Sequence, residues 1–492
     1  MAATIQDLHI LFFPFMAPGH IIPTVDLAKL FASRGVKSTI LTTPGNAPSI
    51  QPSIDQANDS CSLRHPIALS LLPFSAVEAG LPDGCENLVT MNLTNHDMRL
   101  KFIKACELLR DPFAGVLREL LPDAVVSDYF LPWTQDAAAA ELAVPRLVFH
   151  SISLFSLCAS HSINSFKVLE SVPPGGAESF VLPGLPHRIE MQRSQIRDSS
   201  KMPEMAAFFD QCKNSEERSY GVVANSYYEL EPDYAEHYRK VVGRRVWNVG
   251  PVSLCNRNEI EKSRRGDETS IDCNQCLSWL NTKKPGSVVY VCFGSMYKLP
   301  IAQIREIAWG LEALDKPFVL VVRGVRGNDS EWLPEGFEEE VVGRGKGLII
   351  RGWAPQTLIL NHEAVGGFVT HCGWNSCMEG VSAGVPMIAW PMFAEQFFNE
   401  RLIVEVLKVG IGVGVKEYAH FGAERRVVAG EEIRRAVGRV MDGGEEAEEM
   451  RRRARKLAEM ARRAVEEGGS SYVEVGELIQ ELIGRKKTAG TE

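Results

Sequence analysis

Apolar runs alternate with amphipathic stretches from the start of the chain. The opening contains a short apolar run, an amphipathic stretch and a second apolar run, at residues 9–16, 21–35 and 36–44. Short apolar runs bounded by turn residues predict buried strands, whereas Leu27, Leu30 and Phe31 recur at the spacing of one helical face. Pro23 suits the first turn of this helix, and Gly35 suits its end. The chain therefore opens with a predicted strand, helix and strand.

The same alternation recurs in both halves of the chain. In the first half the segments lie at 123–128, 134–143 and 144–151, and in the second at 287–295, 300–314, 317–323, 347–353, 366–372 and 385–391. Strands that alternate with helices form parallel sheets covered by helices on both faces. We therefore predict an α/β fold with two doubly wound parallel sheets, one in each half.

A polar, charged segment separates the two series. Residues 256–272 have no apolar period, and we expect an interdomain linker over 253–272. The predicted domains are 1–252 before this linker and 273–470 after it. Farther on, residues 445–467 carry Arg and Glu three and four positions apart, which predicts a solvated surface helix held by ion pairs.

Composition narrows the range of partners. The chain has 492 residues, of which 45% are hydrophobic and 23% charged, as in ordinary globular proteins. A net charge of −9 argues against nucleic acid or an anionic membrane surface as the main partner. The apolar run before Pro18 is too short for a signal peptide, and no stretch reaches the ~20 residues of a membrane span. We therefore expect no integral membrane contact.

Cysteine usage indicates a reducing compartment. Eleven cysteines are scattered without a framework, which predicts free thiols and a cytoplasmic protein. Cys273 and Cys276 form a lone C-x-x-C pair, while His362 and His371 have only Cys372 nearby. Neither group has the ligand spacing of a metal site, so we expect no bound metal.

Three polar features of the first half follow predicted strands. Gly19 and His20 follow the first strand, Asp128 ends another, and Ser151 and Ser153 follow a third. Ligands of open parallel sheets bind beyond the carboxyl ends of strands. The positive end of the following helix favours a neutral imidazole at His20, the form that takes up a proton. Asp128 could hold one ring nitrogen and stabilise the imidazolium, as in a catalytic triad. The alternative for His20 is a loop or capping role.

The second half contains a strand, a turn and a helix start over 366–380. Ser376 and Glu379 have the spacing of a capping box, which would satisfy the backbone of the helix start. Alternatively, the backbone N–H groups of this helix start, with His371, Asn375 and Ser376 beside them, hold a phosphate or diphosphate. The tight turn Gly294–Ser295 offers a second place where backbone can approach phosphates. Spacing alone does not decide between capping and anion binding.

One long segment resembles a known family. Residues 353–396, WAPQTLILNHEAVGGFVTHCGWNSCMEGVSAGVPMIAWPMFAEQ, are similar to the signature box of plant secondary-product UDP-glycosyltransferases. The segments PFMAPGHIIPTVDLAKLFASRG, VVSDYFLPW, NSYYELEPDYAEHY, CLSWL and VVYVCFGS also resemble this family, so the likeness covers most of the chain. The most similar branch acts on flavonoids, coumarins, other phenolics and sapogenins.

This resemblance implies a GT-B fold with two facing Rossmann-like domains. The acceptor would bind the first domain and the UDP-sugar the second, and residues 471–492 would return to the first. The implied donor residues are Trp353, Ala354 and Gln356 for uracil, Glu379 for ribose, Ser295, His371, Asn375 and Ser376 for the diphosphate, and Trp374, Glu395 and Gln396 for the sugar. Gln396 favours glucose over galactose. Ile152 departs from the family, which has Thr there, so Ser151 or Ser153 would supply the hydroxyl to the sugar.

The resemblance also implies a mechanism. His20 would remove the proton of an acceptor hydroxyl, Asp128 would orient His20, and a single displacement would convert UDP-α-glucose into a β-glucoside. The start of the helix and His371 would stabilise the departing diphosphate without a metal or other cofactor. The apolar acceptor would lie among Gly19, Phe15, Met91, Phe130, Phe155, Phe208 and Ala394.

Several alternatives remain at the level of the sequence. The same chemistry could use another UDP-sugar or form a C-linkage, and a protein of this kind could bind UDP-sugars or small ligands without catalysis. A nicotinamide dehydrogenase is disfavoured because the chain lacks the glycine fingerprint of dinucleotide-binding folds. We expect a monomer whose partners are a UDP-sugar and a small lipophilic acceptor.

Overall fold

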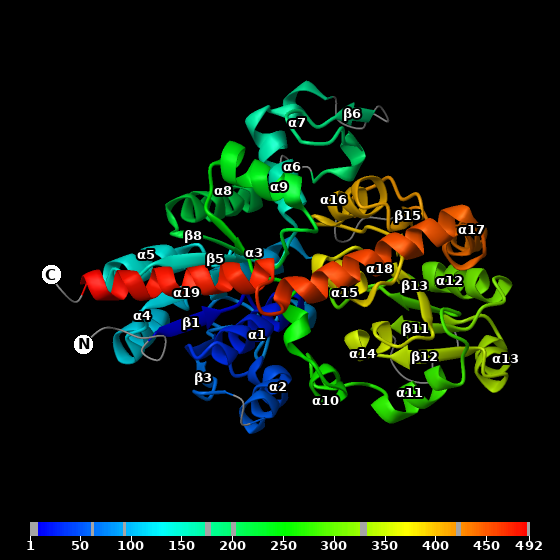
Figure 1. The fold of residues 1–492 in the computed structure, drawn as a ribbon, viewed down its shortest axis with the longest axis horizontal. Coiled ribbons are helices and arrows are strands. Elements are labelled where there is room, and N and C mark those ends of the chain that lie inside the picture. The colour runs from blue at the N-terminus through cyan, green and yellow to red at the C-terminus, as the bar shows by residue number, and fades with distance from the viewer. Residues whose placement is uncertain are drawn as a thin grey trace. The chain divides into compact units, whose positions relative to one another are not determined.

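The chain folds into two compact units. The computed structural model describes residues 8–60, 63–91, 95–172, 179–197, 203–324, 332–419 and 425–489. The N-terminal unit consists of Met1–Leu154, Asp198–Arg257 and Arg463–Glu492, and the C-terminal unit consists of Phe155–Arg197 and Asn258–Arg462. Each unit contains a parallel sheet flanked by helices (Figure 1).

The described strands of the N-terminal unit form one seven-stranded sheet. In sheet order they are β3 (Ala68–Leu71), β2 (Lys37–Thr42), β1 (His9–Phe13), β4 (Ala124–Asp128), β5 (Arg146–His150), β8 (Gly221–Ala224) and β9 (Val246–Asn248). All pair in parallel, and Ile10 of β1 lies between Ser38 of β2 and Ala124 of β4. The strand order reverses between β1 and β4. Ligands of doubly wound sheets bind at this kind of switch point.

The helices of this unit connect and cover its strands. They are α1 (Pro18–Ser33), α2 (Ala47–Asp59), α3 (His96–Glu107), α4 (Arg110–Leu120), α5 (Trp133–Leu142), α8 (Pro203–Arg218), α9 (Pro232–His237) and α19 (Ser470–Ala489), with short turns Leu88–Thr90, Tyr238–Val242 and Val252–Cys255. Ile10 and Phe12 of β1 share one buried cluster with Leu478 and Leu482 of α19. A fully buried leucine contributes about 1.5–3 kcal/mol, so the last helix supplies part of this core.

Helix α1 begins earlier than the sequence predicts. It starts at Pro18 rather than near residue 21, so His20 lies inside its first turn and Pro23 lies in its interior. Proline fits the first helical position because its fixed φ is already helical and its missing N–H has no helical partner there. Gly35 follows the helix end with a φ of +85°, as expected for a helix stop.

The described strands of the C-terminal unit form a second parallel sheet. In sheet order they are β12 (Gly347–Arg351), β11 (Phe318–Val322), β10 (Val288–Cys292), β13 (Val365–Thr370), β14 (Met387–Ala389) and β15 (Gly410–Gly412). The order reverses between β10 and β13, which gives this unit its own switch point. The prediction of two doubly wound parallel sheets is confirmed.

The helices of the C-terminal unit pack on this sheet or extend from it. They are α6 (Leu154–Ser165, whose first residue groups with the other unit), α7 (Val168–Ser171), α10 (Glu259–Ser263), α11 (Cys273–Asn281), α12 (Ile301–Ala313), α13 (Phe337–Gly343), α14 (Gln356–Leu360), α15 (Trp374–Ala383), α16 (Gln396–Arg401), α17 (Gly430–Met441) and α18 (Glu445–Val465, whose last three residues group with the other unit). Short turns span Arg193–Gln195 and Leu402–Val406, and β6 (Ser179–Val181) pairs antiparallel with β7 (Glu190–Gln192).

One segment groups differently from the predicted domains. Phe155–Arg197 lies within the predicted domain 1–252 but belongs to the C-terminal unit. The hydroxyl of Ser194 donates to the carbonyl of Lys416 at 2.6 Å, and the N–H of Tyr418 donates to the carbonyl of Ser194 at 2.7 Å. These bonds join residues far apart in the chain, so no local pattern signals them.

The predicted linker is partly folded. Asn256 is buried and its amide donates to Asp26 at 2.8 Å, while Lys29 donates to its side-chain oxygen at 3.0 Å. Residues 259–263 then form α10, capped by Asn258. The start of the predicted linker is therefore part of the N-terminal unit.

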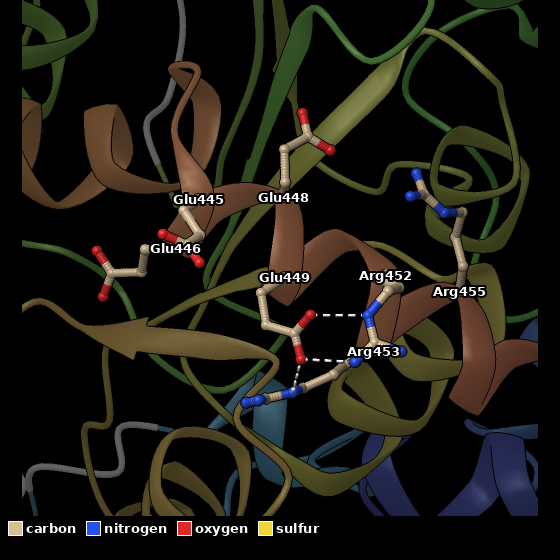
Figure 2. A pocket seen from close by; sticks show the side chains of 7 residues that line it. All are labelled: Glu445, Glu446, Glu448, Glu449, Arg452, Arg453 and Arg455. Atoms are coloured by element: carbon tan, nitrogen blue, oxygen red, sulfur yellow. Dashed lines mark hydrogen bonds and ion pairs between the residues drawn. The ribbon is translucent and has the colours of Figure 1, made fainter.

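Helix α18 is the charged surface helix that the sequence predicts. Glu449 pairs with Arg452 at 2.7 Å and with Arg453 at 2.8 Å, and neighbouring glutamates and arginines line a shallow, charged pocket (Figure 2). Its alanines at 447, 454, 458, 461 and 464 are buried beneath this polar face. Among the helices in the described ranges, none has both the length and the apolar content to cross a membrane.

Candidate active site

His20 and Asp128 meet at the switch point of the N-terminal unit. His20 follows β1 in the first turn of α1, and Asp128 is the last residue of β4, the strand next to β1. The ring Nδ1 of His20 lies 2.7 Å from Oδ2 of Asp128, and the side chains are 24% and 2% exposed. The backbone N–H of Phe130 donates to Oδ1 of Asp128 at 2.9 Å. The carboxylate is therefore fixed on both oxygens, and the imidazole keeps some contact with solvent.

A buried arginine supports the end of β4. The guanidinium of Arg146 donates to the backbone oxygen of Asp128 at 2.8 Å, to the hydroxyl of Ser127 at 2.8 Å and to the hydroxyl of Ser219 at 2.9 Å. Burial lowers the pKa of Arg146 to about 10, partly offset by the negative charges of Glu216 and Asp128. Arg146 therefore remains charged at neutral pH and connects β4, β5 and the residue after α8.

Aromatic rings surround His20. The rings of Phe15 and Phe130 lie 5.6 and 5.5 Å from the imidazole and 5.4 Å from each other. Phe208 lies 6.3 Å from Phe130, and Phe209 lies 5.9 Å from it. The structure thus brings together three of the predicted acceptor residues and adds Phe209, which stands next to Phe208 in the chain and gives no separate signal.

The other predicted acceptor and sugar residues have varied surroundings. Met91 is 8% exposed, Ser151 is 9% exposed, and Ser153 is fully buried. Gly19 lies in the first turn of α1. Phe155 is fully buried and belongs to the C-terminal unit.

His371 occupies the switch point of the C-terminal unit. It follows β13, while Gly294 and Ser295 follow the neighbouring strand β10. A Cβ atom at Gly294 would lie 2.6 Å from the imidazole, and one at Gly373 would lie 2.5 Å from it. The two glycines thus let backbone pass close to the ring. Its Nδ1 is buried and has no hydrogen-bond partner among the described residues.

The imidazole of His371 is neutral at physiological pH. Burial, followed by the positive charge of Arg323, lowers the pKa of His371 from 6.5 to about 4. A neutral imidazole carries one N–H donor and one acceptor nitrogen. An anion placed here would therefore receive a hydrogen bond from the ring rather than a full positive charge.

The start of α15 does not form the capping box that the sequence leaves open as one of two alternatives. The N-cap is Gly373, which has no side chain to cap the helix. Ser376 lies at the third helical position, where its hydroxyl accepts a hydrogen bond from the Gln356 amide at 3.0 Å. The helix start therefore has the form in which backbone N–H groups bind an anion.

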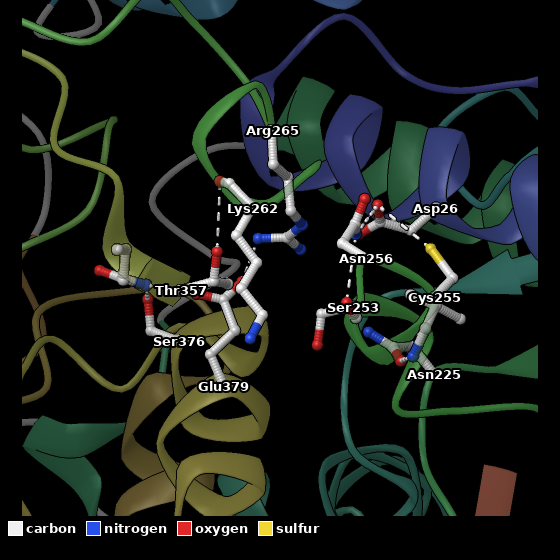
Figure 3. A network of polar contacts seen from close by, with 12 residues as sticks. Asp26, Asn225, Ser253, Cys255, Asn256, Lys262, Arg265, Thr357, Ser376 and Glu379 are labelled. Atoms are coloured by element: carbon white, nitrogen blue, oxygen red, sulfur yellow. Dashed lines mark hydrogen bonds and ion pairs between the residues drawn. The ribbon is translucent and has the colours of Figure 1, made fainter. Parts of the chain in front are cut away.

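Glu379 is the centre of a buried polar network (Figure 3). Its Oε1 pairs with Nη1 of Arg265, and the Gln356 amide donates to its Oε2 at 2.8 Å. The hydroxyl of Tyr290 donates to the Gln356 side-chain oxygen at 3.4 Å. Gln356 thus connects Glu379 to Ser376 and to the sheet.

Trp353 makes a cation–π contact with Arg323. The guanidinium of Arg323, which follows β11, lies 4.4 Å from the Trp353 ring centroid. A guanidinium over an aromatic ring is a favourable contact that fixes the ring plane. The next residue, Ala354, is 7% exposed, and its carbonyl accepts from the backbone of Gln356 at 2.8 Å.

Gln396 forms hydrogen bonds with the loop that precedes α16. Its Oε1 accepts hydrogen bonds from the backbone of Met392 at 2.9 Å and of Phe393 at 3.0 Å, which leaves its amide hydrogens for other partners. Ala394 has a φ of +55°, and its N–H donates to the hydroxyl of Tyr418 at 2.9 Å. Oε1 of Glu395 accepts from Asn399 at 3.4 Å.

The comparisons with known proteins identify the family. The family model described as UDP-glucoronosyl and UDP-glucosyl transferase matches residues 273–425. Over 479 residues, 97% of this chain and 98% of the relative, the sequence is 49% identical to scopoletin glucosyltransferase of Nicotiana tabacum. It is 48% identical to UDP-glucose flavonoid 3-O-glucosyltransferase 7 of Fragaria ananassa over 488 residues, 97% of this chain and 96% of that one.

The chain belongs to the plant UDP-glycosyltransferases. The resemblance and the enzyme class predicted from the sequence are therefore confirmed.

Solved glycosyltransferases share the fold. Glycyrrhiza uralensis UGT73P12, complexed with glycyrrhetinic acid 3-O-monoglucuronide, has a TM-score of 0.90 and 41% identity over 98% of both chains. Medicago truncatula UGT71G1, complexed with UDP-glucose, has a TM-score of 0.79 and 25% identity over 98% of this chain and 100% of that one. The GT-B class of fold predicted from the sequence is confirmed.

Three arginines of this glycosyltransferase were not among the predicted site residues. Arg146 supports Asp128, Arg323 lies over Trp353, and Arg265 pairs with Glu379. Arg146 and Arg323 interrupt or end apolar strands, which is a weak signal for a buried cation. Arg265 lies in the polar segment 256–272, where nothing in the sequence marks it. Within the described ranges, no three His, Cys, Asp or Glu side chains gather as a metal site.

Proposed function

We propose that this glycosyltransferase moves glucose from UDP-glucose to a hydroxyl of a small lipophilic plant metabolite, with inversion to a β-glucoside. The observation that carries the proposal is the His20–Asp128 pair at the carboxyl end of the N-terminal sheet. A hydrogen bond from Nδ1 to a buried carboxylate leaves Nε2 as the basic nitrogen of a neutral imidazole. This is the arrangement that a general base for a hydroxyl requires.

The donor is assigned to the C-terminal unit. His371, Asn375, Ser376 and Ser295 would hold the diphosphate, and two observations support this: the unpartnered Nδ1 of His371 among the described residues and the glycine at the N-cap of α15. Trp353, backed by Arg323, would stack on uracil beside Ala354 and Gln356. Glu379 would accept hydrogen bonds from the ribose hydroxyls. Each of these roles is inferred from the family resemblance together with the geometry.

The sugar contacts are proposed for a second group of residues. Trp374, Glu395 and Gln396 would contact glucose, and the amide hydrogens of Gln396 are available because its oxygen is already bonded to the backbone. Of Ser151 and Ser153, we favour Ser151 for the additional sugar contact because it retains exposed surface.

The proposed reaction is a single displacement. Nε2 of His20 takes the proton of the acceptor hydroxyl, and the resulting oxygen nucleophile forms the new bond to the anomeric carbon. The bond from that carbon to the UDP oxygen breaks, and UDP leaves with the electron pair. Asp128 stabilises the imidazolium formed, while the start of α15 and His371 stabilise the charge on the diphosphate. We propose that these groups act without a metal ion.

The acceptor is proposed to be an aromatic or terpenoid alcohol. Phe15, Phe130 and Phe208 form an apolar environment around His20, with Gly19 beside it, and Met91, Ala394 and Phe155 stay predictions. The names of the relatives, which include a scopoletin and a flavonoid glucosyltransferase, support the same class. A cytoplasmic location and a monomeric state stay predictions.

The proposed function is tested by the variant His20→Ala. We expect the rate of glucose transfer to fall at least ~10³-fold, while the affinity for UDP, measured calorimetrically, changes little. His187→Ala, at a histidine outside the site, serves as the matched control. Normal turnover by His20→Ala would show that His20 is not the base.

The substrate assignment needs a separate experiment. The protein is incubated with UDP-glucose or UDP-galactose and a panel of coumarins, flavonols and triterpenoids, and products are detected by mass spectrometry. We expect glucosides from UDP-glucose in preference to galactosides. If UDP binds but no acceptor of any class is glycosylated, the non-catalytic alternative replaces the proposal.

A further inference from the structure

Residues 262–270, which follow the last strand of the first sheet in the chain and precede the first strand of the second, contact the proposed uridine site. Within the C-terminal unit, the N–H of Ser270 donates to the carbonyl of Trp353 at 2.9 Å, and the N–H of Trp353 donates to the Ser270 hydroxyl at 2.9 Å. The hydroxyl of Thr357 donates to the carbonyl of Lys262 at 3.5 Å. The third contact is the Arg265–Glu379 ion pair. Residues 262–270 therefore contact three residues of segment 353–396, namely Trp353, Thr357 and Glu379.

Arg265 and Glu379 form the most buried of these contacts. Their side chains are 9% and 4% exposed, and Nη1 of Arg265 bonds to Oε1 of Glu379. Figure 3 shows the arginine reaching from the segment beyond α10 toward the carboxylate on α15. A buried carboxylate is stable only when it is paired and hydrogen-bonded. Arg265 supplies the charge that pairs with Glu379.

The two carboxylate oxygens have different protein partners. Oε1 bonds to Arg265, and Oε2 accepts from the Gln356 amide, so the carboxylate plane is fixed from both ends. Each carboxylate oxygen can accept a second hydrogen bond. One site on each oxygen therefore remains for the two hydroxyls of a ribose, which are neighbours on its ring.

We propose that Arg265 is a positioning residue for the donor nucleotide. It holds Glu379 in the orientation in which the carboxylate accepts the ribose hydroxyls of UDP-glucose. Arg265 acts through Glu379 and does not itself touch the reacting atoms. The inference rests on the proposed function, because it takes the ribose as the ligand of Glu379, and it extends that function to a residue outside the signature segment.

The test measures how strongly the protein distinguishes UDP from 2′-deoxy-UDP. Dissociation constants for both are measured by calorimetry on the full chain, on Arg265→Gln and on Arg265→Lys. Arg264→Gln is the matched control, since this neighbouring arginine is exposed. The ratio of the two constants reports the contact of the 2′-hydroxyl, and a general loss of stability does not change it.

We expect the original protein to bind UDP about tenfold or more tightly than 2′-deoxy-UDP, because a hydrogen bond to a charged group is lost with the hydroxyl. Arg265→Gln should weaken UDP binding and reduce the ratio to within about twofold of one. Arg265→Lys, which retains the charge but has no planar fork, should give an intermediate ratio. Arg264→Gln should behave like the original protein.

Each other outcome overturns a defined statement. An unchanged ratio in Arg265→Gln, or in Arg265→Lys if the glutamine variant does not fold, overturns the positioning role. Tighter UDP binding by either variant also overturns it, because Arg265 would then compete with the ribose. If the original protein binds UDP without preference over the deoxy form, the inference fails and the proposed function stands. If it binds no UDP, the proposed function itself fails.

Discussion

Nδ1 of His20 lies 2.7 Å from Oδ2 of Asp128, although the two residues are 108 positions apart in the chain. They meet because β1 and β4 are adjacent parallel strands whose carboxyl ends lie at the same edge of the sheet. The carboxylate is buried and receives a backbone N–H on its other oxygen, so the imidazole meets a fixed acceptor. The pair is thus preorganised by the sheet rather than by flexible side chains.

Asp128→Asn should remove the charge of this pair while retaining its shape. We expect kcat to fall about 10³- to 10⁴-fold, because an amide does not stabilise the imidazolium and permits the wrong ring tautomer. The measurement is the initial rate of glucoside formation at saturating UDP-glucose. Asp136→Asn, which alters a surface pair with Arg218, serves as control. Equal losses in both variants would contradict a specific role for Asp128.

Arg146→Lys should disturb the His20–Asp128 pair indirectly, through the backbone of Asp128. Lysine retains the charge but cannot reach the oxygens of Asp128, Ser127 and Ser219 together, so the end of β4 should shift. We expect kcat to fall about 10- to 100-fold, as for a small misplacement of a catalytic group, with the affinity for UDP unchanged. The control is Arg118→Lys on the surface. A variant with wild-type kcat would refute this support role.

Gly294→Ala should disturb the proposed anion site of the C-terminal unit. Its added Cβ would lie 2.6 Å from the His371 ring, and the residue has a φ of +71°. Gly286→Ala is a matched control, because its φ is +66° and its Cβ would meet nothing within 4 Å. Both variants carry the backbone cost of about 1–2 kcal/mol, but only the first displaces His371. We expect calorimetry to show a loss of UDP affinity in Gly294→Ala alone.

Glu400 should make the stability of the protein depend on pH. Burial raises its pKa from 4.5 to about 8, modified by the nearby charges of Arg401 and Glu405. Between these two pKa values the folded state binds more protons than the unfolded state, so this group contributes most stability below about pH 4.5. Its contribution decreases as the pH rises and is lost above about pH 8.

The melting temperature of Glu400→Gln minus that of the original protein should therefore increase as the pH rises from 6.5 to 8.5, because only the original protein has a carboxyl group there to ionise. This window lies above the titration of His9, whose pKa burial lowers to about 4. Glu405→Gln, at a more exposed carboxylate of the same region, should show a smaller dependence. If the difference between Glu400→Gln and the original protein is constant across the window, Glu400 does not titrate in it.

The sequence predicted the parts of this protein that local pattern determines. Alternating apolar and amphipathic segments placed β1, β4, β10 and β13, and with them the strand ends that carry His20, Asp128, Ser295 and His371. The predicted start of α1 is residue 21, three residues after the observed start at Pro18. Either Pro18 or Pro23 can occupy a first helical turn, so the proline pattern does not distinguish the two starts. Helix ends are set by capping contacts, which short patterns indicate poorly.

Contacts between distant segments were beyond the reach of the sequence. Arg146, Arg265 and Arg323 acquire their partners only when strands and loops far apart in the chain come together. The same holds for Phe155–Arg197, which groups with the C-terminal unit and bonds through Ser194 to Lys416 and Tyr418.

Helix α19 places Leu478 and Leu482 in the same core as Ile10 and Phe12 of the first strand. In order of synthesis, the C-terminal unit is therefore an insertion within the N-terminal one. The ribosome must complete nearly the whole chain before this core can close, because the strands of the first sheet are made by residue 248 but α19 is made last. A fragment ending at residue 252 would lack that last helix, and folding of the N-terminal unit is coupled to translation of α19.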